Sequence, residues 1–182
     1  MRVLVCGLNP SLVAADAGFG YAGATNRFWR AAVSSGLVAS VRARGPLDVL
    51  SEDAVGMTDL VKRATARASE LNGVDYRAGF ARVARLVAWL QPRLVLFVGL
   101  AGWRAAVERR AQPGLQPTVA ALGPALAYVM PSTSGLNAAT RMEELVGHMR
   151  AAIVAADPAE PADPADPGGR ADPAEPAGRA DG

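Results

Sequence analysis

One short loop near the start of the chain carries an amide side chain in a position where chemistry could occur. The apolar run 3–6 is followed by Gly7-Leu8-Asn9-Pro10-Ser11. The proline biases the preceding residue away from helix, so the chain turns sharply after the run. An asparagine amide does not titrate, so Asn9 could orient a water or an amide-bearing ring but could not act as an acid or a base. Taken alone, the pattern also fits a turn whose side chain only satisfies local backbone groups.

A second loop of similar character follows another apolar run. Residues 126–130 lead into Met130-Pro131-Ser132-Thr133-Ser134-Gly135-Leu136. Small residues such as Ser132, Ser134 and Gly135 allow backbone amides to approach a phosphate closely. Ligands of α/β proteins bind beyond the carboxyl ends of the strands, and both loops follow strand-like runs. We therefore expect the two loops to line one cleft.

The rest of the chain supplies the elements that would position these loops. The continuous apolar run 94–98 is typical of a strand that is covered on both faces, as in parallel sheets. The spacing of apolar residues predicts helices over 26–35, 80–90 and 142–153, and another that begins near Ala101. Alternating strands and helices imply parallel pairing with helices on both faces. The prediction is an α/β fold, a three-layer α/β/α sandwich with a short, mainly parallel central sheet.

The chain divides into a body and a tail of different composition. Residues 1–156 are long enough for one domain with a buried core. Residues 157–182 form an acidic Pro/Ala-rich tail without bulky apolar side chains, and we expect this tail to be disordered. Seven carboxylates against two arginines give the tail a net charge of −5, so the body carries +7 within a whole-chain charge of +2. A basic body suggests an anionic partner, although an ordinary charge excess explains the composition as well.

The scarcity of cysteine and histidine excludes several kinds of site. Cys6 is the only cysteine, so one chain cannot form an internal disulfide or a cysteine metal centre, and we expect this side chain in the core. His148 is the only histidine and is expected to be structural. No signal-peptide pattern or apolar run of spanning length is present, so we expect a cytoplasmic monomer without a membrane partner, metal or organic cofactor.

Four motifs, taken in order, resemble those of one family of enzymes. After the Asn9 loop come Gly18-Phe19-Gly20-Tyr21 with Asn26-Arg27-Phe28-Trp29, then Gly56-Met57-Thr58-Asp59-Leu60-Val61, then the loop that ends at Leu136. In this order and at these separations, residues 2–153 resemble the mismatch-specific uracil-DNA and thymine-DNA glycosylases of the uracil-DNA glycosylase superfamily. Each motif alone is a weak signal, and the order of the four makes the combination specific.

The resemblance implies a role for each matching residue in the base pocket. Asn9 corresponds to the family's catalytic asparagine, which positions the attacking water. Asp59 falls where relatives carry a polar or charged residue that influences activity. Tyr21 corresponds to an aromatic residue that stacks on the extruded base, and Leu8 and Ser11 would lie beside that base.

The resemblance also assigns the second loop to DNA. Ser132, Ser134 and Gly135 would contact the backbone of the DNA, and Leu136 falls at the wedge position that fills the gap left by a flipped base. Arg27 flanks an earlier motif and is expected to contact a phosphate.

Three of these assignments have a structural alternative. Tyr21 could cover the edge of the core. Asp59 could cap a short turn over residues 60–62. Leu136 could pack against the following helix, with Asn137 as the cap of that helix.

Departures from the family leave the range of bases open. Ser11 stands where a glycine often follows Asn-Pro, and Asp59 stands where better-known relatives carry Lys or Asn. Asn137 and Ala138 occupy positions where some bacterial relatives place an arginine that contacts the opposite strand. A strict preference for mismatches is therefore not implied, and hypoxanthine or xanthine are further candidate bases.

The function predicted for residues 1–156 is that of a monofunctional DNA glycosylase. Such an enzyme flips uracil, or another deaminated or mismatched base, out of DNA and hydrolyses its N-glycosidic bond. A non-catalytic module that binds damaged DNA on the same scaffold is an alternative, because the first motif lacks a strong base. An enzyme that acts on free nucleosides or nucleotides is a third candidate.

Overall fold

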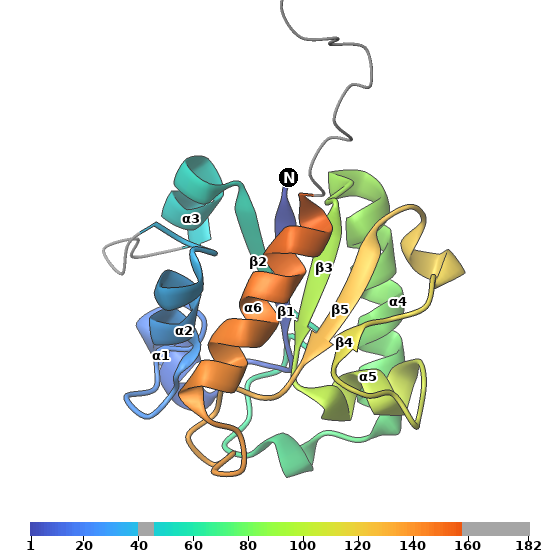
Figure 1. Ribbon diagram of the computed structural model, residues 1–182. Coiled ribbons are helices and arrows are strands. Elements are labelled where there is room, and N and C mark those ends of the chain that lie inside the picture. The colour runs from blue at the N-terminus through green and yellow to red at the C-terminus, as the bar shows by residue number, and fades with distance from the viewer. Residues whose placement is uncertain (40–45, 158–182) are drawn as a thin grey trace, which may run out of the picture.

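The computed structural model describes residues 1–39 and 46–157, and its five strands form one sheet in the order β2-β1-β3-β5-β4 (Figure 1). Strand β1 pairs in parallel with β2 and β3, and β3 pairs in parallel with β5. The two-residue β4 runs antiparallel to β5 at the edge of the sheet. In chain order the strands and α-helices are β1 Val3–Gly7, α1 Leu12–Ala17, α2 Phe28–Ser35, α3 Pro46–Asp53, β2 Val55–Asp59, α4 Gly73–Leu90, β3 Leu94–Val98, α5 Leu100–Ala106, β4 Gly114–Leu115, β5 Leu126–Met130 and α6 Met142–Ala156.

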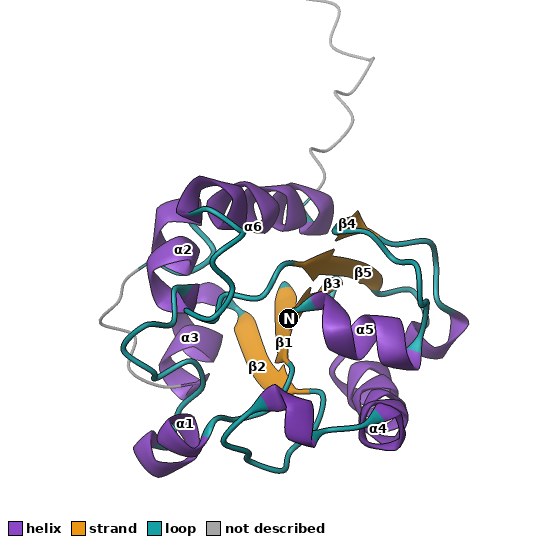
Figure 2. Cartoon of the chain, turned by 90° about the horizontal axis from the view of Figure 1, so that it is seen from below, coloured by secondary structure: helices purple, strands orange, loops and turns teal. Residues whose placement is uncertain are grey.

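Alternate residues of each central strand point to opposite faces of the sheet. In β1, Val3 and Val5 belong to a core cluster with residues of α2 and α6, whereas Leu4 and Cys6 belong to a second cluster with residues of α4 and α5. Figure 2 shows α2 and α6 on one side of the sheet and α4 and α5 on the other. The predicted three-layer α/β/α sandwich with a mainly parallel sheet is therefore confirmed.

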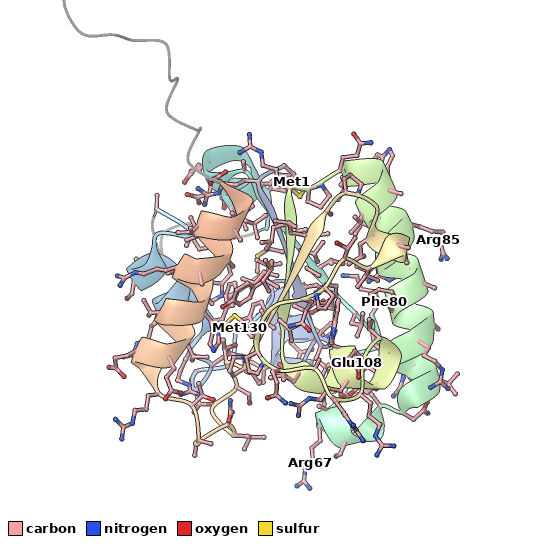
Figure 3. All side chains as sticks on the ribbon, turned by 45° about the vertical axis from the view of Figure 1, so that its right-hand side comes forward. Met1, Arg67, Phe80, Arg85, Glu108 and Met130 are labelled. Atoms are coloured by element: carbon pink, nitrogen blue, oxygen red, sulfur yellow. The ribbon has the colours of Figure 1, made fainter. Side chains whose placement is uncertain are left out.

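The central strand β3 is buried along its whole length, as its uninterrupted apolar sequence predicts. Helix α4 begins at Gly73 because the side chain of Asn72 accepts hydrogen bonds from two amides of the first turn. Figure 3 shows Met130 in the interior and Arg85 projecting from the outer face of α4. Cys6 is buried, as expected.

Strand β2 and helices α1 and α3 add to the predicted elements. β2 has the sequence VGMTD, and only part of it is apolar, so it does not stand out as a strand. Its pairing with β1 nevertheless brings Asp59 level with Gly7 at the end of the sheet.

The first residue assigned to the tail contacts the body. Asp157, which the prediction assigns to the tail, follows α6 and accepts a hydrogen bond of 2.6 Å from Arg93. It also pairs with Arg2 at 3.8 Å. Residues 158–182 lie outside the described residues, so the disorder of the tail stays a prediction. Within the part of the chain that the structure describes, no helix is long and apolar enough to cross a membrane.

Candidate active site

The two predicted loops line one pocket of about 210 Å³ at the carboxyl ends of the strands. This pocket follows from the topology, because β1 and β5 both lie next to β3 and run in the same direction. Every residue assigned to the site from the sequence lines it, with the exception of Gly135. These residues are Leu8, Asn9, Ser11, Tyr21, Asp59, Ser132, Ser134 and Leu136.

The amide of Asn9 is held in one orientation by its nitrogen. Nδ2 donates hydrogen bonds to Thr65 Oγ1 at 2.8 Å, to the Arg63 carbonyl at 3.0 Å and to the Pro10 carbonyl at 3.1 Å. Carbonyl oxygens only accept hydrogen bonds, so the nitrogen must face them and Oδ1 must face the other way. Two of the three acceptors, on Arg63 and Thr65, come from a distant segment. The alternative that Asn9 only satisfies backbone groups of its own turn is therefore wrong.

Backbone hydrogen bonds bring that distant segment to Asn9. Beyond the ends of β1 and β2, the Leu60 amide donates to the Gly7 carbonyl, the Val61 amide to the Leu8 carbonyl and the Thr65 amide to the Pro10 carbonyl. Nothing in the sequence around Thr65 marks it as a site residue. Only the pairing of the two strands could have identified it.

Asp59 is the last residue of β2, and its side chain is 21% exposed. Lys62 Nζ lies 3.5 Å from one carboxylate oxygen. The guanidinium of Arg82 donates to the backbone carbonyl of the same aspartate. Burial raises the pKa of Asp59, whereas Lys62 and Arg82 act to lower it. No helix begins directly after Asp59, and the Leu60 and Val61 amides donate to the Gly7 and Leu8 carbonyls rather than to its side chain.

Tyr21 forms one wall of the pocket in an unusual backbone conformation. Its φ is 61°, which is uncommon for a residue other than glycine, and its ring stacks on Phe28 with a centroid distance of 3.9 Å. Its hydroxyl is buried and has no hydrogen-bond partner among the described residues. A Cβ atom at Gly7 would lie 2.9 Å from this hydroxyl and 2.7 Å from Asp59 Oδ1, so a larger residue there would displace one of these pocket side chains. One face of Tyr21 covers the core, as the alternative suggests, while the residue still lines the pocket.

Ser11 has a local role as well as a place in the pocket. Its hydroxyl oxygen accepts a hydrogen bond of 3.1 Å from the Ala14 amide and so caps α1. The hydroxyl proton is still available to a ligand.

The second loop presents an apolar side chain to solvent. Leu136 is 92% exposed, whereas Thr133 in the same loop is 1% exposed. Helix α6 begins six residues after Leu136 and is preceded by Arg141 as its cap residue. The alternative that Leu136 packs on this helix, with Asn137 as the cap, is therefore wrong.

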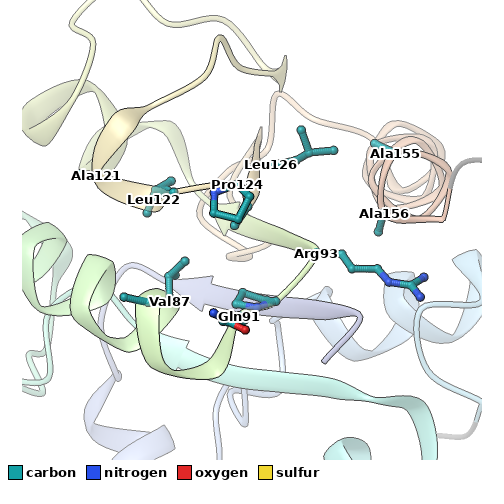
Figure 4. A pocket seen from close by; sticks show the side chains of 13 residues that line it. Val87, Gln91, Arg93, Ala121, Leu122, Pro124, Leu126, Ala155 and Ala156 are labelled. Carbon is teal, nitrogen blue, oxygen red and sulfur yellow. The ribbon is translucent and has the colours of Figure 1, made fainter.

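Of two further cavities, one adjoins the candidate site and the other is remote from it. One of about 320 Å³ shares Tyr21 and Asp59 with the candidate site and extends to Met57 and Lys62. The other, about 900 Å³, lies at the opposite end of the sheet, beside the end of α4 and the end of α6 (Figure 4). Arg93 is its only charged lining residue among those that the structure describes, so it offers no acid–base pair.

No group of three His, Cys, Asp or Glu side chains that could hold a metal ion occurs within residues 1–39 and 46–157. Asp59 is the only carboxylate that lines the candidate site among the described residues, and its polar neighbours there include the fixed amide of Asn9 and the hydroxyls of Ser11 and Thr65.

The fold and the pocket define an α/β protein whose ligand site lies beyond the carboxyl ends of parallel strands. The model of the uracil DNA glycosylase superfamily matches residues 1–154, and the chain belongs to that superfamily. It is therefore a DNA repair glycosylase, a hydrolase that acts on damaged bases in DNA during base excision repair. The family expected from the sequence is confirmed at this level, and the narrower mismatch-specific group stays a prediction.

Proposed function

We propose that the protein removes uracil from DNA by hydrolysing the N-glycosidic bond, and that it leaves an abasic site without cleaving the strand. The observation that carries the proposal is the orientation of Asn9, whose nitrogen is bonded to three protein oxygens. Its Oδ1 takes no part in these bonds, and Asn9 lines the pocket that Asp59 also lines. An amide oxygen in this position can accept a hydrogen bond from the attacking water.

Access to the base requires that it leaves the duplex. Extrusion costs a few kcal/mol of stacking and pairing. Leu136, exposed at the tip of the second loop, can fill the vacated space. Tyr21, which lines the pocket, can stack on the extruded base, a contact of about 1–3 kcal/mol in other proteins that bind single bases.

Hydrolysis needs a group that removes a proton, and Asn9 cannot supply it. The Asp59 carboxylate lines the same pocket and is the candidate general base. Its negative charge would also stabilise the positive charge that develops on the sugar. The departing uracil becomes negative, and the Lys62 ammonium, 3.5 Å from one carboxylate oxygen of Asp59, would help to offset that charge. Because Asn9 orients the water, its substitution should reduce catalysis more than it reduces binding of DNA.

The test is excision from a duplex that contains one uracil, followed by alkali to cleave abasic sites. Wild-type protein should release uracil and give an alkali-labile strand. Asn9→Ala should lose excision by two orders of magnitude or more, while its affinity for the duplex stays within a few-fold. Asn72→Ala is the matched control, because this amide only caps α4 and should affect stability rather than excision.

Undiminished uracil release by Asn9→Ala would defeat this mechanism. Binding without an alkali-labile product from the wild-type protein would favour the non-catalytic module. A panel with uracil opposite each base, thymine opposite guanine, and hypoxanthine would define the base range. The cytoplasmic location and the monomeric state stay predictions beside this proposal.

A further inference from the structure

Arg27 binds backbone carbonyls of the second loop and of the residues that continue it as far as Thr140. Its guanidinium donates hydrogen bonds to the carbonyl oxygens of Thr140, Asn137 (2.7 Å) and Ser134 (3.3 Å). Its own backbone amide donates to the Thr133 carbonyl at 3.0 Å. The guanidinium is thus engaged with the protein, in contrast to the phosphate contact expected from the sequence.

These bonds decide which way the loop amides point. The described chain contains no cis peptide bond, and in a trans peptide the N–H points opposite to the carbonyl of the preceding residue. The Ser134 and Asn137 carbonyls face Arg27, so the N–H groups of Gly135 and Ala138 point away from it. Neither of these amides donates to a group within the described residues. They are left free to bind an anion such as a DNA phosphate.

Two further contacts hold the loop in the same shape. The side chain of Asn137 donates to the Ser132 carbonyl at 2.8 Å and to Thr140 Oγ1 at 3.1 Å. Gly135 lies against Thr25, and a Cβ atom there would be 2.6 Å from the Thr25 side chain. The loop is therefore ordered before DNA arrives, and its most exposed residue, Leu136, stands at the tip.

We propose that Arg27 is a positioning residue that sets this loop for entry into duplex DNA, an inference that rests on the proposed function. A loop that already has its bound conformation loses little conformational entropy when it binds DNA. Lysine cannot replace Arg27, because one ammonium group lacks the planar fork that reaches three carbonyls at once. The contribution of Arg27 is needed only where a base stack must be opened, and not for hydrolysis itself.

The test compares uracil excision from duplex and from single-stranded DNA. Arg27→Lys should lower kcat/KM on the duplex by about tenfold or more, the loss expected when hydrogen bonds to a charged group are removed. Excision from the single strand should change less than about threefold, because no stack opposes base capture there. Arg30→Lys, exposed on α2, is the matched control and should change neither rate. Equal losses on both substrates, or no loss on either, would overturn the proposal.

A second measurement keeps the outcome separate from that of the proposed function. Hydrogen exchange over residues 131–141 of the free protein should be faster in Arg27→Lys than in the wild type and unchanged in Arg30→Lys. This readout needs no activity, so a wild-type protein that excises nothing would refute the proposed function alone. If Arg27→Lys does not fold, Asn137→Ala should show the same substrate pattern to a smaller degree. Exchange unaffected by Arg27→Lys would show that the arginine does not order the loop.

Discussion

The Asn9 side-chain nitrogen lies 2.8 Å from the hydroxyl oxygen of Thr65, a residue 56 positions later in the chain. The pairing of β1 with β2 continues past the ends of the strands and brings the two residues together. Thr65 is 4% exposed, so its hydroxyl is shielded from competing water. The orientation of the proposed water-binding amide thus depends on a threonine that contributes no chemistry of its own.

Replacement of Thr65 by valine should therefore impair catalysis. The substitution keeps the shape of the side chain but removes one of three acceptors for Asn9, so the amide can rotate. We expect kcat to fall by up to about tenfold, the worth of one hydrogen bond, with little change in KM. Single-turnover excision of uracil measures the effect, with exposed Thr118→Val as the control. An unchanged kcat would show that the other two acceptors are sufficient.

Asp59→Asn should remove the proposed general base and alter the pH profile. Because the carboxylate must be ionised to accept a proton, the wild-type rate should rise with pH through the raised pKa of Asp59. In the variant this rise should be absent, and the rate at neutral pH should fall by about 10²–10⁴-fold. Rates measured across the pH range under single-turnover conditions test this. A variant that retains the wild-type profile would assign the titration to another group.

The same substitution should stabilise the fold at neutral pH. Burial raises the pKa of Asp59, so the folded protein holds this proton more tightly than the unfolded chain does. The stability that Asp59 contributes is therefore complete below its unfolded pKa and is lost as the pH rises through the folded pKa. Urea unfolding should show a gain for Asp59→Asn that is largest at neutral pH and shrinks toward acid. A loss of stability at neutral pH would mean that the ion pair with Lys62 outweighs burial.

Leu136→Ala should separate DNA opening from folding. The side chain is 92% exposed, so the free energy of unfolding should change by no more than about 0.5 kcal/mol. Leu145→Ala, in the core, should cost about 2–5 kcal/mol. Excision from a duplex should fall for Leu136→Ala while excision from a single strand is retained. Loss on both substrates would contradict a wedge role.

Removal of residues 158–182 should strengthen DNA binding at low salt. This segment has six carboxylates and two arginines, a net charge of −4, so its removal takes the chain from +2 to +6. Binding that neutralises phosphates weakens steeply with salt, and the difference between the two proteins should shrink as salt is raised. Fluorescence anisotropy with a labelled duplex over a KCl series measures this. Equal affinities at low salt would show that the acidic tail does not oppose DNA binding.

Much of the scaffold could be predicted from the sequence because its signals are local. A continuous apolar run such as Leu94–Val98 is typical of a strand that is buried on both faces, so it can be recognised as a strand without knowledge of its neighbours. Val55–Asp59 contains a glycine and two polar residues, and its pairing with β1 establishes it as a strand. The meeting of the two loops was also predictable, because parallel strands end at the same edge of a sheet.

The sequence by itself determined which side chains stand at the ends of the strands, including the neutral amide of Asn9 and the aliphatic side chain of Leu136. Only the tertiary structure decided their orientation and surroundings. Arg27 illustrates the difference, since its charge alone suggests a phosphate contact, yet its guanidinium lies against three loop carbonyls. The physical reason is that residue type and local spacing set chemical capability, whereas hydrogen-bond partners more than 50 residues apart exist only after the sheet has formed.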